Sequence, residues 1–403
     1  MDNNKNSLIQ KQNRRNILKK VWEERSISRA QIAKDLNITP ATVSSNVAEL
    51  EKMNFIRLGQ EGESSGGRKP KMLEINETSL LSIGITVKKF EVVSVIVNLK
   101  GKPKITRTDK YPLPITKENI FNTIIYSIKE LKKNVNGNLQ RILGIGVGFH
   151  GIVDYKSGIS IFAPAFNWRY VNIKALLENE FKLPVIVDND ARVMVLAEKW
   201  FGKYRNLNNL IFLSLDAGVG GGILIDGKLF RGVTSAAGEI GHIRVKENGV
   251  KCLCGNYGCL ETVASSKALV QEIITKINLG YPTIITSMVN NGDLNEINYE
   301  IIDTAARNND ALAIEVLNNI GVYVGTALAD IINVFNPEAV IIGGQLSQSW
   351  QFIETQISET VKKQSMTECC KNVKILKSSF EGSKGEIGAA ALVLNKILEE
   401  DFL

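Results

Sequence analysis

The sequence predicts an α/β protein in which a small, basic, mainly helical head precedes a larger body of two lobes. Residues 1–76 show helical periodicity and hold 14 Lys and Arg against 9 Asp and Glu, whereas residues 77–403 hold 35 against 33. Beyond residue 78, apolar or β-branched runs alternate with helical stretches, which is typical of α/β layers. We therefore expect one domain over residues 1–76 and a two-lobed body over residues 77–403.

The first two helices of the head follow from apolar spacing and a capping signal. Ile17, Val21 and Trp22 fall on one face of a helix. Ser28 is expected to cap the next helix, with Gln31 three residues later as in a capping box.

A third helix is expected over residues 40–53, after a turn. Thr39 is its cap, and Pro40 occupies the first helical position, where a missing N–H costs nothing. Its buried face holds Val43, Val47 and Leu50. Two short helices joined by a tight turn, the second with small polar residues at its start, form a helix-turn-helix layout.

Residues 55–58 and 72–75 are expected to form two strands around a Gly/Ser-rich loop at 59–69, which makes the head a winged helix. Its charge and small polar side chains favour DNA binding, and the alternative is a three-helix module for binding protein. The expected DNA contacts are Arg29, Thr39, Ala41, Thr42, Ser44, Ser45, Asn46, Arg68 and Lys69.

The body is expected to be built from strands and helices in alternation. A hairpin over 81–97 is followed by buried strands at 142–147 and 184–187, and a helix then runs through residue 200. Strands at 210–215 and 222–225, helices from 266 to 334 and a strand at 339–342 complete the second half. Two lobes of this kind would place a ligand cleft between them.

Four side chains form a metal-binding signature within residues 238–261. His242, Cys252, Cys254 and Cys259 supply one nitrogen and three sulfurs, which is a set that closes a tetrahedral zinc site. A closed set leaves no position for water, so the zinc would be structural. The alternative is three incidental reduced cysteines, and adjacent Cys369-Cys370 is expected to be inert.

Targeting signals are not evident in the sequence. The N-terminal stretch is polar, and no uninterrupted apolar run approaches the roughly 18 residues that a membrane span needs. We therefore expect a cytoplasmic protein without a membrane partner, whose cysteines stay reduced or bind metal.

The head, the segment SSGGRKP at 64–70, the GEIGH segment at 238–242 and the CLCGNYGCLE segment at 252–261 together resemble the ROK family of repressors, open reading frames and sugar kinases. In layout the chain is most similar to the xylose repressors of low-GC Gram-positive bacteria. The resemblance implies an actin/hexokinase-like body, a zinc site, a homodimer or tetramer, and a response to sugar.

The resemblance also implies a sugar site. Asn189 and Asp190 match the family's Asn-Asp motif, and Glu239 and Glu261 match its other hydroxyl-binding acids. His242 would orient this pocket while ligating the metal. The full set of implied sugar contacts is Asn189, Asp190, Glu239, His242, Glu261 and, as a weaker candidate, Asn167. His150 replaces a proline of the family and is either a ligand-reading group or, as we expect, a satisfied buried histidine.

Kinases of this family use two phosphate-binding turns, and both have changed here. In the first, Thr86 replaces the aspartate that organises Mg²⁺, and Lys88-Lys89 replaces glycines. In the second, Asp216-Ala217 introduces an anion and removes a hydroxyl, although Gly343-Gly344 survives. Phosphoryl transfer depends almost entirely on positioning and charge neutralisation, so we expect no catalytic residues and no enzymatic activity.

The resemblance therefore implies a sugar-responsive transcriptional repressor of carbohydrate-utilisation genes, of the xylose type. A dimer would read a palindromic operator, and sugar bound between the lobes would relieve DNA binding. One alternative is an active ATP-dependent sugar kinase with an appended DNA-binding head. Another keeps the head but makes the body a docking platform for a protein partner.

Overall fold

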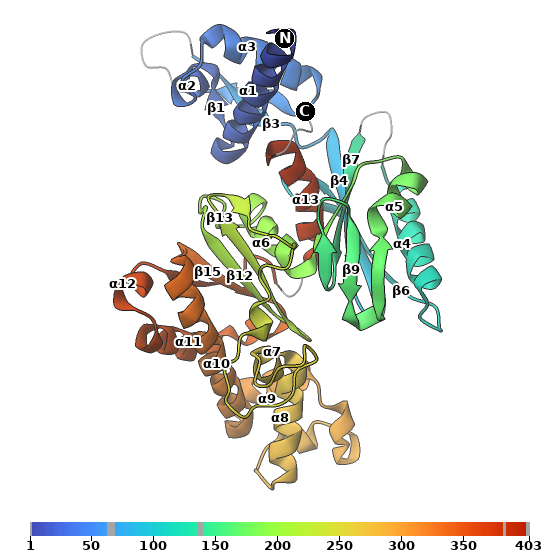
Figure 1. The fold of residues 1–403 in the computed structure, drawn as a ribbon, viewed down its shortest axis with the longest axis vertical. Helices are drawn as coiled ribbons and strands as arrows, with labels where there is room; N and C mark the ends of the chain where they lie inside the picture. The colour runs from blue at the N-terminus through green and yellow to red at the C-terminus, as the bar shows by residue number, and fades with distance from the viewer. Residues whose placement is uncertain (1, 63–68, 136–139, 382–383, 400–403) are drawn as a thin grey trace. The chain divides into compact units, whose positions relative to one another are not determined.

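The computed structural model describes residues 2–62, 69–135, 140–381 and 384–399, which form two compact units (Figure 1). Unit 1 runs to Asn206 and resumes at Gly385, so it contains the head and the first lobe of the body. Unit 2 is Leu207–Lys384. The C-terminal helix thus returns to the unit in which the chain began. The expected domain boundary between residues 76 and 77 stays a prediction.

The head is the predicted winged helix. Its three-stranded antiparallel sheet has the order β1-β3-β2, so the strand after the wing lies in the middle. Its elements are α1 (Asp2–Glu24), β1 (Ile27–Ser28), α2 (Arg29–Asp35), α3 (Pro40–Lys52), β2 (Ile56–Glu61) and β3 (Lys71–Ile75).

Both predicted helix caps of the head are present. Ser28 Oγ accepts from the Gln31 amide at 3.1 Å, and Thr39 Oγ1 accepts from the Thr42 amide at 3.1 Å. The reciprocal half of the capping box is wrong, because the Gln31 side chain donates to Asp35 at the other end of α2. This hydrogen bond directs the Gln31 side chain along the helix, away from the Ser28 amide at its start.

The first lobe is a five-stranded mixed sheet of order β11-β7-β4-β5-β6, with helices on both faces. The predicted hairpin is β4 and β5, and the predicted buried strands are β7 and β11, which pair in parallel. Its elements are β4 (Leu80–Val87), β5 (Glu91–Asn98), β6 (Pro103–Lys110), α4 (Lys117–Lys132), β7 (Arg141–Phe149), α5 (Ile173–Phe181), β11 (Val185–Asn189), α6 (Asp190–Trp200) and α13 (Gly385–Glu399). A small antiparallel sheet between β7 and α5 contains β8 (Ile152–Asp154), β9 (Ile159–Ala163) and β10 (Trp168–Asn172), with the short helix η1 (Pro164–Phe166).

Along β7, large apolar side chains on one face of the sheet alternate with glycines on the other face. Ile145, Val147 and Phe149 belong to the core that α4 and α5 cover. Their neighbours Gly146 and Gly148 face α13 and α6, where a Cβ on Gly146 would lie 1.7 Å from the Ala389 carbonyl oxygen. Successive side chains of a strand point to opposite faces. Because the residues on the α13 side are glycines, α13 packs directly against the backbone of β7.

The head is joined to the first lobe through aromatic side chains. Trp22 of α1 packs edge-on against Trp200, the last residue of α6, with ring centroids 6.5 Å apart, and lies 6.3 Å from Phe201. Both tryptophans are buried, at 7% and 3% exposure. Lys19 of α1 also pairs with Glu399 at the end of α13 at 2.5 Å. The first helix of the head is therefore packed on the C-terminal ends of the two helices that cover one face of the sheet.

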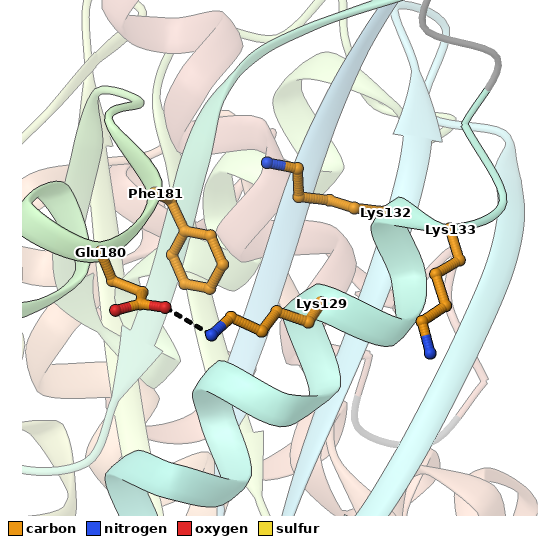
Figure 2. A pocket seen from close by; sticks show the side chains of 5 residues that line it. All are labelled: Lys129, Lys132, Lys133, Glu180 and Phe181. Carbon is orange, nitrogen blue, oxygen red and sulfur yellow. Dashed lines mark ion pairs between the residues drawn. The ribbon is translucent and has the colours of Figure 1, made fainter.

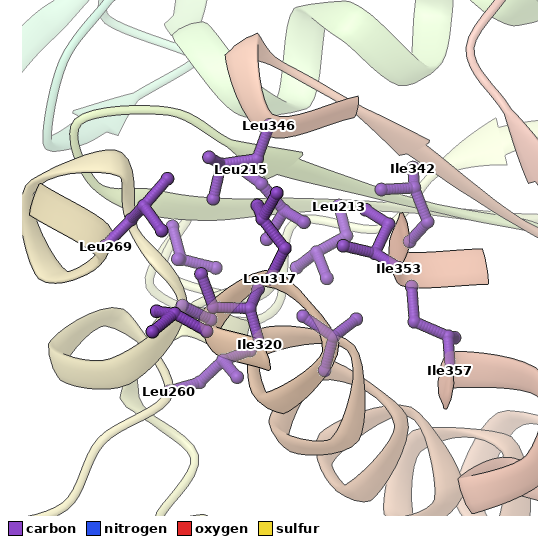
Figure 3. Packing of buried hydrophobic residues seen from close by; sticks show 14 of the residues in the cluster. Leu213, Leu215, Leu260, Leu269, Leu317, Ile320, Ile342, Leu346, Ile353 and Ile357 are labelled. Carbon is purple, nitrogen blue, oxygen red and sulfur yellow. The ribbon is translucent and has the colours of Figure 1, made fainter. Parts of the chain in front are cut away.

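Unit 2 is built on a second five-stranded sheet, of order β14-β13-β12-β15-β16. Helices α10 and α11 pack against each other, and their apolar side chains meet those of β12 and β15 in a continuous core (Figure 3). Its elements are β12 (Leu210–Leu215), β13 (Val219–Ile225), β14 (Lys228–Leu229), η2 (Ile240–His242), α7 (Glu261–Ala264), α8 (Ser266–Asn278), η3 (Ile285–Ser287), η4 (Asn290–Gly292), η5 (Leu294–Glu296), α9 (Tyr299–Arg307), α10 (Ala311–Phe335), β15 (Ala339–Gly343), η6 (Gln345–Ser349), α11 (Trp350–Gln364), α12 (Thr367–Cys370) and β16 (Lys374–Lys377). The predicted strands and the predicted helical stretch of this half are confirmed.

Helix α10 is the one helix in the described ranges whose length and composition would suit a membrane span. Leu317, Ile320, Val324 and Leu328 on this helix are buried in the core of unit 2. Its apolar character is therefore explained by packing inside this unit.

The glycine contact between β7 and α13 gives a test of the packing. Gly146→Ala places a methyl group against the Ala389 carbonyl, where neither backbone can move without disturbing the sheet. We expect this overpacking to cost about 1–3 kcal/mol or more and to lower the melting temperature by several degrees. Gly280→Asn is the control, because a Cβ there meets nothing within 4 Å and Asn tolerates positive φ. A melting temperature unchanged in Gly146→Ala by calorimetry would refute this packing.

Candidate functional site

The predicted metal ligands converge on one point in unit 2. One ligand atom from each of His242, Cys252, Cys254 and Cys259 lies within 4.8 Å of all the others. His242 Nδ1 is 3.6 Å from Cys252 Sγ, and Cys254 Sγ is 3.7 Å from Cys259 Sγ. The four side chains can therefore hold a metal ion.

Two of these separations are close to those between the ligands of a tetrahedral metal centre. With Zn–S bonds of about 2.3 Å and a Zn–N bond of about 2.0 Å, tetrahedral angles require about 3.8 Å between sulfurs and about 3.5 Å between nitrogen and sulfur. Burial raises the pKa of Cys259 to about 12, and burial also raises the pKa of Cys252. A bound cation would oppose both effects, because it favours the thiolate.

The loop that carries the cysteines is held by short backbone contacts. The Cys252 amide donates to the Asn256 carbonyl at 2.7 Å, and the Gly258 amide donates to the Val250 carbonyl at 3.0 Å. Gly258 has a φ of +71°, and a Cβ there would lie 1.8 Å from the Lys246 carbonyl oxygen. Only glycine fits this turn, so the residue directly before the third cysteine is restricted to glycine.

Glu239 lies beside the metal-ligand histidine. Its Oε2 is 3.7 Å from His242 Nε2, the ring nitrogen that is turned away from the cysteines. The carboxylate thus lies on the Nε2 side of the ring, while Nδ1 faces the cysteines. The roles of Glu239 and His242 as sugar contacts stay predictions. Cys369 and Cys370 are outside this cluster of ligands.

Asn189 and Asp190 lie at the junction of β11 and α6, in unit 1. Asn189 caps α6, because its Oδ1 accepts from the amides of Ala191 at 2.9 Å and Arg192 at 3.1 Å, while its Nδ2 donates to the Gly151 carbonyl at 3.0 Å. Its side chain thus ties two loops together. Asp190 keeps a partly exposed carboxylate, at 35%, in the first turn of the helix.

A buried ion pair supports this junction and was not expected from the sequence. Arg192 Nε donates to Asp188 Oδ1 at 2.7 Å, and the two side chains are 2% and 0% exposed. The Asn189 amide donates to the same carboxylate oxygen at 2.8 Å. Buried charges are costly unless they are paired. Because Asp188 is in β11 and Arg192 is in α6, the pair fixes the direction in which α6 leaves the strand.

His150 is not the buried histidine that the sequence led us to expect. Its side chain is 47% exposed, and its Nδ1 lies 3.7 Å from Asp190 Oδ2. Burial raises the pKa of Asp190, but His150 and the Ala191 amide lower it by more, so the net pKa is below its ordinary value. Burial of Phe149 does not extend to the next residue, because β7 ends there.

Asn167 is exposed on the loop between β9 and β10 and has a left-handed backbone, with a φ of +53°. The rings on both sides of it, Phe166 and Trp168, contact Phe149 at 5.6 and 5.8 Å between centroids. These rings tie the loop of Asn167 to the end of β7, one residue before His150. Its contact with sugar stays a prediction.

The second phosphate turn of the kinases is occupied by carboxylates here. Asp216 Oδ1 accepts from the Gln345 amide at 2.8 Å, and its Oδ2 accepts from Ser214 Oγ at 2.6 Å. Glu261 Oε2 accepts from the Val219 amide at 3.1 Å, and its role as a sugar contact stays a prediction. Backbone amides that could cradle a phosphate are thus bonded to two anions of the chain itself, and these anions would repel a phosphate group.

The first phosphate turn is a tight hairpin between β4 and β5. The Lys88 amide donates to the Glu91 carbonyl at 2.9 Å, and the Lys88 ammonium pairs with Glu91 at 3.3 Å. Thr86 is 5% exposed and lies against Gly385 at the start of α13, where a Cβ would be 2.6 Å from its hydroxyl. A buried hydroxyl cannot replace the carboxylate that holds Mg²⁺ in these enzymes.

The exposed start of α3 carries most of the expected DNA contacts. Ala41, Ser44 and Ser45 are exposed and Thr42 is half-buried. The expectation that Asn46 lies on this exposed face is wrong. Its side chain is buried, at 5% exposure, and its amide donates to the Thr42 carbonyl at 2.9 Å. Position 46 follows Val43 by three residues, which puts it on the buried face of the helix.

Two of the three expected cationic DNA contacts lie within the described residues. Arg29 pairs with Glu51 at 3.4 Å and is 42% exposed. Lys69, at the end of the wing loop, is exposed. Arg68 lies outside the described residues. The contact of each of these side chains, and of Thr39, with DNA stays a prediction.

A shallow basic hollow lies elsewhere in unit 1. Figure 2 shows Lys129 and Lys132 of α4 and the following residue Lys133 on one side, and Glu180 and Phe181 of α5 on the other. Lys129 pairs with Glu180 at 2.5 Å, and Lys132 lies over the Phe181 ring at 5.6 Å. None of the expected functional residues lines it.

Comparisons with known proteins match both parts of the chain. The sequence pattern of the ROK family matches residues 81–396, and that of winged helix-turn-helix DNA-binding domains matches residues 10–57. The chain is 31% identical to a xylose repressor of Caldicellulosiruptor bescii over 97% of this chain and 98% of that protein.

Two solved structures are also similar. A ROK family transcriptional regulator, a homologue of the Escherichia coli MLC protein, superimposes with a TM-score of 0.85 at 29% identity, covering 97% of each chain. A ROK family glucokinase from Streptomyces griseus superimposes with a TM-score of 0.70 at 30% identity, covering 77% of this chain and 98% of that one.

The metal cluster gives the second test. Cys259→Ser should remove most bound metal and lower the melting temperature, because metal-binding free energy contributes directly to the folded state. Cys370→Ser is the matched control, since it changes the same chemical group outside the cluster. Metal content per chain and calorimetry provide the measurements. Equal melting temperatures for the wild type with and without a chelator, with metal loss verified, would exclude a structural role.

Proposed function

This chain belongs to the ROK family, and from this membership we propose that it is a sugar-responsive, DNA-binding transcriptional repressor of carbohydrate-utilisation genes. The similarity to the xylose repressor extends through head and body, and the solved regulator matches over 97% of both chains. The head binds operator DNA, and the body senses sugar. The chain is a regulator and not an enzyme.

The fold of the body is shared with a glucokinase, so the fold does not argue against the kinase alternative. The residues at the two turns disfavour it. A phosphate at the second turn would compete with Asp216 for the Gln345 amide and would lie near the Glu261 carboxylate. A fold comparison does not separate sensor from kinase, but these anions do.

One observation supports a mechanical connection between the proposed sugar site and the DNA-binding head. Helix α6 begins at Asp190, in the candidate sugar site, and ends at Trp200, on which Trp22 of the head is packed. Its residues from Ala191 to Trp200 are all buried, and its 11 residues span roughly 16 Å. A buried helix of this length moves as a rigid piece, so a displacement at Asp190 reaches the head.

This link supports repression that is relieved by sugar. Sugar bound at Asp190 shifts α6, and Trp22 transmits the shift to α1. The mechanism requires sugar to bind the state with low operator affinity better than the state with high affinity. Engagement of the same sugar by Glu239, His242 and Glu261 of unit 2 stays a prediction.

The remaining assignments of this proposal follow the family resemblance. The metal in the cluster is structural Zn²⁺, which its ligand types and spacings favour. The sugar is of the xylose type, the protein acts in the cytoplasm, and a homodimer or tetramer presents two heads to a palindromic operator.

The exposed face of α3 gives a test of DNA binding. Ser45→Asp adds a negative charge where phosphates would approach, and we expect operator affinity to fall by about tenfold or more without loss of folding. Ser287→Asp, an exposed serine of unit 2, is the control. Gel shifts on a duplex selected by the wild type from a random library provide the measurement. Undiminished binding by Ser45→Asp would place the DNA interface elsewhere.

Sugar response gives a separate test. Adding D-xylose should lower the operator affinity of the wild type, and Asp190→Ala should abolish this effect while leaving sugar-free binding intact. Asp330→Ala, an exposed position on α10, is the control for loss of a carboxylate. Gel-shift titration over a panel of monosaccharides measures both. If no sugar alters operator affinity, the body is a docking platform instead; if Asp190→Ala still responds, the sugar binds elsewhere.

A further inference from the structure

The end of β7 places a second polar group beside the carboxylate that we assign to sugar. Strands β7 and β11 are parallel neighbours, and their register pairs Phe149 with Asn189. The residue that directly follows each strand is therefore His150 after β7 and Asp190 after β11. Their approach to 3.7 Å is thus a consequence of the sheet and not of a chance surface encounter.

The carboxylate is only partly committed within the protein. Asp190 Oδ1 accepts from the Ala191 amide at 2.9 Å, and Oδ2 is the oxygen that faces His150 Nδ1. The two side chains are 35% and 47% exposed, so both can contact a bound molecule. The loops beneath them are fixed by the Asn189–Gly151 hydrogen bond and by a glycine at 151 whose Cβ would lie 2.2 Å from the Phe162 carbonyl oxygen.

The contact between His150 and Asp190 adds little to the stability of the fold. An ion pair with this much exposure contributes at most about 1 kcal/mol, and the junction is already held by the buried Asp188–Arg192 pair. The protein therefore presents an imidazole edge next to a carboxylate, on a rigid platform.

We propose that His150 is a specificity-determining residue for the sugar, which contacts the hydroxyl next to the one that Asp190 binds. This inference rests on the proposed function. A carboxylate only accepts hydrogen bonds, whereas an imidazole N–H donates one. Two such groups in fixed positions read two neighbouring hydroxyls at once, and they distinguish a sugar from its epimer or deoxy analogue at either carbon.

Calorimetric titration of the full chain with D-xylose, D-glucose and their monodeoxy analogues tests this role. For the sugar that binds, His150→Ala should weaken affinity about three- to tenfold. One deoxy analogue should bind the wild type more weakly than its parent sugar, and His150→Ala should bind the two alike. His150→Gln, which keeps a donor and an acceptor, should restore part of the difference.

Lys110→Ala, an exposed position on β6, is the control and should keep wild-type selectivity. Wild-type affinity and selectivity in His150→Ala would overturn the role of His150 and leave the proposed function intact. If the wild type binds none of the sugars in the panel, the proposed function fails together with this inference. Equal melting temperatures of the variants ensure that the comparison reports binding and not folding.

Discussion

The structure of unit 1 depends on the packing of helix α6. Its N-terminus is fixed by the Asn189 cap and the Asp188–Arg192 pair, and its C-terminus carries the aromatic contact with the head. Trp200 also donates to Asn395 of α13 at 3.2 Å, so the two helices on this face of the sheet are tied at the end that faces the head. Because every residue between these ends is buried, α6 cannot bend or fray to absorb a displacement.

The same body fold serves as an enzyme and as a sensor, and a few local charges separate the two. At the turn after β12, Asp216 and Glu261 take the backbone amides, and the hairpin after β4 holds a lysine paired with a glutamate. At each turn, groups that would face a phosphate in a kinase instead contact side chains of the protein itself. Asp190, in the proposed sugar site, keeps a partly exposed carboxylate, so the proposal separates the binding of a polyol from its phosphorylation.

Elements with local signals could be predicted from sequence. The caps at Ser28 and Thr39, the buried strands and the metal ligands each follow from spacing within a short segment. The predictions that were wrong concern the tertiary surroundings. Asn46 falls on the buried face of α3, Gln31 bonds forward along its own helix, and His150 is exposed because β7 ends before it. The Trp22–Trp200 contact joins residues far apart in the chain, and no local pattern indicates it.

The central claim is that α6 and Trp22 carry the sugar signal to the DNA-binding head. Trp22→Leu keeps an apolar side chain but removes the ring contacts with Trp200 and Phe201. The decisive quantity is the ratio of operator affinities without and with sugar, measured by gel shift alongside calorimetric sugar binding. We predict that sugar still binds Trp22→Leu while this ratio falls close to one. A ratio equal to that of the wild type would contradict the claim.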